Sequence, residues 1–198
     1  MTRPKTFPPI PFQCFRNFHR AFQGDFYERC ARCGGVCEHK RIGTLLPGES
    51  YFLARARGLS VRELRARYLD QLVLGNRKAD VIKLRMRCRL LDAQGRCTIA
   101  RLKPVLCEIY PIVFEVQGRS IHYSIDRACP ISRDRSLVRQ LLEVGVPAFK
   151  ALPIPFEFMR LLSRYDGLDF DYAALERGRA DRPGYTRFAL AEIMQFRK

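Results

Sequence analysis

The chain has 198 residues, of which 47% are hydrophobic, and a formal charge of +16 from 36 Lys and Arg against 20 Asp and Glu. This length and apolar content exclude a compositionally disordered chain and fit one domain with room for an appended subdomain. No apolar run approaches the ~18 residues that span a bilayer, and residues 1–20 lack the continuous apolar segment of a signal peptide. We therefore expect a cytoplasmic protein with no membrane span.

Aromatic residues mark the first element. Residues 1–13 are proline-rich and predict an extended arm. In residues 14–29, the spacing of Phe15, Phe18 and Phe22 is helical, which predicts a helix packed on the core or over the cysteines. The glycine-containing stretch 30–43 predicts a loop.

Two helices are predicted next. Pro47-Gly48 precedes a helix expected over about 49–57, with Gly58 as its end. Ser60 is a predicted N-cap with Glu63 as its capping-box partner. The second helix is expected to end at Gly75, with an apolar stripe of Val61, Leu64, Tyr68, Leu69 and Leu72.

The remaining chain mixes strands and helices. Residues 80–87 alternate as a strand does, and IVFEV and SIHYSI within 111–125 predict a hairpin. After Cys129-Pro130 we expect helices, interrupted by prolines, over 131–145, 156–165 and 186–197. The predicted fold class is α+β: a small irregular cysteine-rich metal core with a β-hairpin, surrounded by α-helices. We expect an arm and helix in 1–29, a cysteine-cluster domain in 30–130 and a helical extension in 131–198.

Eight cysteines are the most informative feature of the composition. Cys30 and Cys33 have the spacing of a metal knuckle, in which two thiolates on a tight turn face one ion. Gly34 and Gly35 allow the backbone to curl, and Cys37 returns a third sulfur to the same loop. In a reducing compartment such clusters are more often ligands than disulfides, which are the alternative.

Later cysteines lie near predicted turns, where ligands are usually presented. Four thiolates complete one zinc site or one [4Fe–4S] cluster. The seven candidate cysteines are therefore more than one such site needs and one fewer than two sites need. Cys14 or His39 could supply an eighth ligand, or one thiol stays reactive. The predicted metal ligands are Cys30, Cys33, Cys37, Cys88, Cys97, Cys107 and Cys129.

The other polar residues near these cysteines receive simpler interpretations. His39 lies two residues past Cys37 and is the best histidine ligand, whereas His19 and His122 have no motif around them and are predicted to be structural. Several carboxylates close in sequence to the cysteines could orient ligands or move protons, but each is expected by default to be a solvated surface group: Asp25, Glu28, Glu38, Glu108 and Asp126.

Three sequence runs resemble a known family. CARCGGVC at 30–37, CRLLDAQGRCTIARLKPVLCEIYP at 88–111 and the late Cys129-Pro130 are similar to the YkgJ-type cysteine-cluster family of zinc- or iron-chelating CxxCxxCC domains. The similarity covers about residues 28–130. Val36 stands where the family has the first cysteine of its early pair, and Ala100, Lys103 and Glu108 also depart from its pattern. The resemblance implies metal chelation by the cysteines.

A related domain occurs in flagellin lysine N-methylases, but this chain has no glycine-rich methyl-donor site, so that activity is not transferred. The first hypothesis is an iron–sulfur protein, of the [4Fe–4S] type, in a redox or protein-modification role. The alternative is a structural zinc module whose basic surface binds an acidic protein or nucleic acid. A thiol-nucleophile enzyme ranks below both, because no Cys/His pairing is visible.

Overall fold

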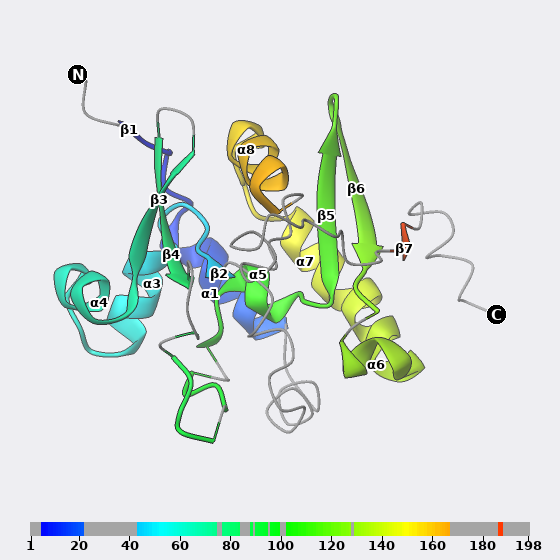
Figure 1. Cartoon of the computed structure of the whole chain (residues 1–198), viewed down its shortest axis with the longest axis horizontal. Helices are drawn as coiled ribbons and strands as arrows, with labels where there is room; N and C mark the ends of the chain where they lie inside the picture. Colours follow the sequence, from blue (N-terminus) through cyan, green and yellow to red (C-terminus); the bar gives the residue numbers. More distant parts are fainter. Residues whose placement is uncertain are drawn as a thin grey trace, which may run out of the picture.

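The computed structural model describes residues 5–21, 43–74, 77–83, 88, 90–94, 96–99, 102–127, 129–166 and 186–187. These residues form an α+β fold, as predicted, but with a mixed sheet that the sequence did not indicate. In Figure 1 this sheet and the β5–β6 hairpin lie on opposite sides of the molecule, with helices between them.

The sheet is organised around β4 (Arg77–Lys83). Strand β1 (Lys5–Thr6) pairs with it in parallel, whereas β2 (Gly43–Thr44) and β3 (Asp70–Leu74) pair with it antiparallel. The predicted strand 80–87 therefore begins earlier than expected, and its residues 84–87 lie outside the described part. The predicted arm contains β1 and the start of the first helix.

The helix expected to reach Gly75 ends at Tyr68, and this prediction was wrong. Helix α4 (Val61–Tyr68) is followed by Leu69, whose backbone is extended with φ −115° and ψ 145°. The chain then continues as β3, in register from Asp70 opposite Val81 to Leu74 opposite Arg77. Pairing with a neighbouring strand thus overrides the helical spacing of the leucines.

Other local helix signals are confirmed. Helix α1 (Phe12–Ala21) buries Phe15 and Phe18 as predicted, and α3 (Glu49–Ala56) ends before Gly58, whose φ of +65° favours glycine. Ser60 caps α4, with the reciprocal Glu63 hydrogen bond of a capping box.

The hairpin prediction is confirmed. Strands β5 (Ile112–Gln117) and β6 (Ser120–Ile125) pair from Ile112 opposite Ile125 to Gln117 opposite Ser120. Gly118 in the connection has a φ of +59°. Strand β7 (Thr186–Arg187) pairs with β6, so the helix predicted over 186–197 does not begin at 186, and residues 188–197 lie outside the described part.

Helices follow Cys129, as expected. They comprise the 3-10 turn η3 (Pro130–Arg133), α6 (Arg135–Gln140), the π-helical η4 (Leu141–Gly145), α7 (Val146–Lys150) and α8 (Phe156–Asp166). The helical path continues through Pro147 instead of ending there. Because proline has no N–H and crowds the preceding turn, a widened π turn before it accommodates the ring.

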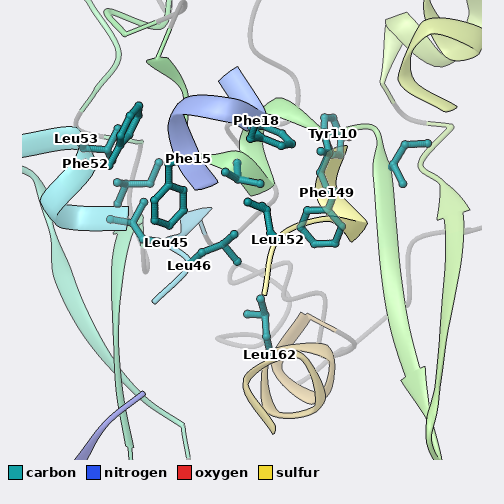
Figure 2. Close-up of a cluster of buried hydrophobic side chains, with 14 of the residues drawn as sticks. Phe15, Phe18, Leu45, Leu46, Phe52, Leu53, Tyr110, Phe149, Leu152 and Leu162 are labelled. Atoms are coloured by element: carbon teal, nitrogen blue, oxygen red, sulfur yellow. The ribbon is translucent and has the colours of Figure 1, made fainter. Parts of the chain in front are cut away.

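A shared core joins the N-terminal and C-terminal helices. Figure 2 shows Phe15 and Phe18 of α1 in the same buried cluster as Phe52 of α3 and Phe149 of α7. Helix α8 packs along β5, and its Phe158 meets Phe7 edge-on at 5.1 Å between ring centroids. None of the described helices is long and apolar enough to cross a membrane.

Candidate functional site

The early cysteine run, residues 30–37, is not part of the chain that the structure describes. Cys30, Cys33, Cys37 and the candidate ligand His39 all lie outside the described residues, so their assignment stays a prediction. The later candidates Cys88, Cys97, Cys107 and Cys129 are described, and each lies beside a loop closure.

Cys88 and Cys97 lie on the two arms of one tight loop. The N–H of Leu91 donates to the Cys88 carbonyl at 3.2 Å, and Leu91 forms an antiparallel bridge with Cys97. Both the N–H and the hydroxyl of Thr98 donate to the Leu90 carbonyl at 2.8 Å. Cys97 therefore lies opposite Leu91, which follows Cys88 by three residues.

Cys107 and Cys129 flank the open end of the hairpin. Cys107 lies in α5 (Val105–Glu108), and Cys129 precedes η3. The Tyr110 hydroxyl donates to Oδ2 of Asp126 at 2.7 Å, and the Asp126 N–H donates to the Pro111 carbonyl at 2.9 Å. Cys107 precedes Tyr110 by three residues, and Cys129 follows Asp126 by three residues. Both cysteines therefore lie at the same end of the hairpin.

The sulfur environments differ within these pairs. Cys88 and Cys129 are buried, whereas Cys97 and Cys107 are half-buried. Thiolates are soft ligands suited to zinc or iron–sulfur clusters. Within the described ranges, no three His, Cys, Asp or Glu side chains are grouped so that they could hold a metal ion.

A second polar cluster lies inside the core, where α1, α3 and α5 meet. It consists of His19 from α1, Glu49 from α3 and Glu108 from α5. The two glutamate residues are 0% exposed. Buried carboxylates are uncommon in proteins unless they are paired or hydrogen-bonded, so each requires a physical account.

Glu49 joins two helix starts. Its Oε2 accepts from the N–H of Leu46 at 2.8 Å, and its Oε1 accepts from the N–H of Val105 at 2.6 Å. Burial raises the pKa of Glu49 to about 7, while the two N–H donors and His19 act in the opposite direction. This carboxyl group thus fixes the first residue of α5, two positions before Cys107.

Glu108 faces His19. Oε2 of Glu108 lies 2.8 Å from Nδ1 of His19, whose side chain is 8% exposed. The distance is that of a hydrogen bond, but the two groups are not aligned as donor and acceptor. Burial raises the pKa of Glu108 to about 7, and its contact with His19 lowers it.

Both ring nitrogens of His19 lack an aligned hydrogen-bond partner among the described residues, as do both carboxylate oxygens of Glu108. Nε2 of His19 is buried and makes no hydrogen bond with any part of the protein that the structure describes. A buried polar atom without a partner costs about 1–3 kcal/mol, and it commonly marks the position of a water or an ion. An imidazole nitrogen in this state fits a metal-binding role.

Sequence reasoning missed this cluster. His19 was predicted to be structural, and Glu108 was predicted by default to be exposed to solvent. The prediction for Glu108 was wrong, because its side chain is fully buried. Asp126 is also buried. A signal was present: His19 follows Phe15 by four residues on the apolar face of α1, and Glu108 follows Val105 by three on α5.

Part of the positive charge packs on aromatic rings. The described cation–π pairs are Arg55 over Phe12, Arg57 over Tyr68, Arg77 over Phe7 and Lys150 over Tyr123, all 4.9 to 5.3 Å from the ring centroid. These side chains cover apolar surface as well as carrying charge.

Comparison with protein-family models, with curated proteins and with solved structures found no match for this chain. The resemblance to the YkgJ-type cysteine-cluster family therefore depends on the sequence runs at 30–37, 88–111 and 129–130 alone.

Proposed function

We propose that this protein holds a metal centre through cysteines from separate segments of the chain, as an iron–sulfur protein in a redox or protein-modification role. The cysteine-bearing loops would form its irregular metal core. The proposed ligands are Cys30, Cys33, Cys37, Cys88, Cys97, Cys107 and Cys129.

One observation carries this proposal. Each of the four described candidates lies within three residues of a hydrogen-bonded closure of the chain. Cys107 and Cys129 are separated by a whole hairpin in sequence yet flank its open end. Metal-binding thiolates are commonly presented from turns and loops, which supports the proposal.

Charge supports the same interpretation. Metal-binding cysteines are deprotonated, so a thiolate centre brings negative charge into the protein. A formal charge of +16 offsets such a centre. When bound, an iron–sulfur cluster supplies one-electron chemistry, which zinc does not.

A structural zinc module is the second candidate, because the same charge would attract an acidic protein or a nucleic acid. In that case the metal would stabilise the fold, and affinity for the partner would fall steeply as salt is raised. Binding of a DNA duplex that is equally strong at low and high salt would remove the electrostatic part of this candidate.

The test is metal analysis of protein purified without oxygen. We expect iron and labile sulfide together, with broad visible absorbance, in the unaltered chain. Cys33→Ser should lose this content, whereas the control Cys14→Ser should keep it, since Cys14 is outside the proposed ligand set. Stoichiometric zinc without sulfide would instead favour the second candidate. A preparation free of both metals would contradict both.

A further inference from the structure

We propose that Nε2 of His19 is a ligand of the metal centre and that Glu108 positions its imidazole. This inference builds on the proposed function, because it requires that a metal centre exists. It assigns a ligand role to a histidine that was predicted to be structural.

The His19 ring is held in one orientation. It stacks on the Phe52 ring with centroids 4.9 Å apart and planes 5° from parallel, and Phe18 meets it edge-on at 5.5 Å. Nδ1 faces Oε2 of Glu108 at 2.8 Å. The ring plane is therefore set by Phe52, and the direction of its two nitrogens by Glu108.

This arrangement matches how metal-binding histidines are supported. Such a histidine donates one ring N–H to a carboxylate and offers the other nitrogen to the metal. In His19 the nitrogen away from Glu108 is Nε2, which is buried and has no hydrogen-bond partner among the described residues. Catalytic and ligand contacts are often poorly aligned before the bound state forms, which fits the geometry of the Nδ1–Oε2 contact.

A simple buried ion pair explains less. Protonation of His19 would place an N–H on Nε2 as well as on Nδ1. Glu108 faces Nδ1 alone, so the second N–H would stay buried without an acceptor. A neutral imidazole that holds a cation at Nε2 and carries its N–H on Nδ1, facing Glu108, leaves no such second N–H.

The position of His19 also suits the cysteine set. Glu108 directly follows the candidate ligand Cys107 in α5, so the contact fixes His19 to a helix that carries a proposed ligand. With His19, the donors proposed for the centre are seven thiolates and one imidazole. His19 would thus take the place that the sequence suggested for His39.

The chain has three histidines, so the ligand can be identified without altering His19. The double variant His39→Gln/His122→Gln leaves His19 as the sole imidazole, provided that no histidine tag is used. X-ray absorption at the metal edge of anaerobically purified protein reports whether an imidazole is bound. We expect imidazole scattering in the unaltered chain and in the double variant, and its loss in His19→Gln.

Glu108 has a separate test as a positioning residue. Glu108→Gln should lower metal affinity in chelator competition about 10- to 100-fold while keeping the imidazole signal. Glu143→Gln, at an exposed position on η4, is the matched control and should leave affinity unchanged.

The outcomes separate the two proposals. A metal-loaded protein whose ligands are sulfur alone, or one that keeps its imidazole signal only while His39 is present, overturns the role of His19 and leaves the cysteine centre standing. Absence of metal from the unaltered chain overturns the proposed function and this inference with it.

Discussion

The backbone N–H of Val105 donates to Oε1 of Glu49 across 2.6 Å, which fastens the first residue of α5 to the first residue of α3. Glu49 is fully buried, and its other oxygen accepts the N–H of Leu46. A single carboxyl group therefore links two helix starts, and it lies within the same polar cluster as His19.

The stability of the protein should depend on pH through Glu49. Its pKa rises from 4.5 to about 7 on folding, so the folded protein keeps this proton at pH values where the unfolded chain has lost it. The stabilisation of the folded state by this proton is complete below pH 4.5 and declines as the pH rises towards 7. Above pH 7 the unfolding free energy no longer changes through Glu49, and the total loss is about 3 kcal/mol.

Glu49→Gln isolates this effect, because other titrating groups act on both proteins. At low pH the variant should be less stable by about 1–3 kcal/mol, since glutamine cannot accept from both N–H donors. The difference between the two unfolding free energies should shrink or reverse as pH rises from 5 to 8. Denaturant unfolding across this range measures it, and a difference independent of pH would contradict the shifted pKa.

The packing of α8 on the N-terminal segment predicts one cooperative unit. Phe158→Ala should lower the unfolding free energy by about 3–5 kcal/mol, because the ring is fully buried against Phe7. The matched control is Phe156→Ala on the same helix, where the ring is 41% exposed and the expected cost is under about 1 kcal/mol.

Thermal unfolding of both phenylalanine variants, followed by near- and far-ultraviolet circular dichroism, gives the measurement. Coincident shifts of the two signals in Phe158→Ala are expected, since the core cluster runs from Phe7 to Leu162. Equal stabilities of the two variants would show that the Phe7–Phe158 contact contributes nothing to folding.

The base of the hairpin should affect metal retention. Tyr110→Phe removes the hydroxyl that donates to the buried Asp126 at 2.7 Å, and so loosens the closure that holds Cys107 and Cys129 at one end of β5 and β6. We expect a loss of about 1–3 kcal/mol in unfolding free energy.

The same variant should also release metal to a chelator faster than the unaltered protein does. Tyr51→Phe is the control, because that ring is 60% exposed on α3 and its loss of a hydroxyl should change neither quantity. If Tyr110→Phe were destabilised but retained metal as before, the hairpin closure would have no role in presenting the cysteines.

Sequence predicted the features that depend on neighbours along the chain. The Ser60–Glu63 capping box, the buried face of α1 and the β5–β6 hairpin all follow from short-range patterns, and all are present. These signals lie within a few residues of one another, so the local backbone preference and the final fold agree.

The missed features depend on distant partners. Leu69 and Leu72 continue a helical stripe, yet the pairing of Asp70 with Val81 makes this segment a strand. Glu108 is buried by α1 and α3, which precede it by many residues in the chain. Its local sequence shows only a charged side chain, which predicts solvent exposure. The cysteine spacing predicted ligands without indicating which thiols share a site, because loop closures such as Tyr110–Asp126 are tertiary contacts.

The proposed metal centre joins cysteines from distant segments of the chain. Its most direct test is the metal and sulfide content per chain of anaerobically purified Cys33→Ser and Cys129→Ser, beside Cys14→Ser and the unaltered protein. We expect each of the first two variants to lose metal, while Cys14→Ser matches the unaltered chain. Full metal content in both, or disulfides joining Cys30, Cys33 and Cys37 in the native protein, would contradict it.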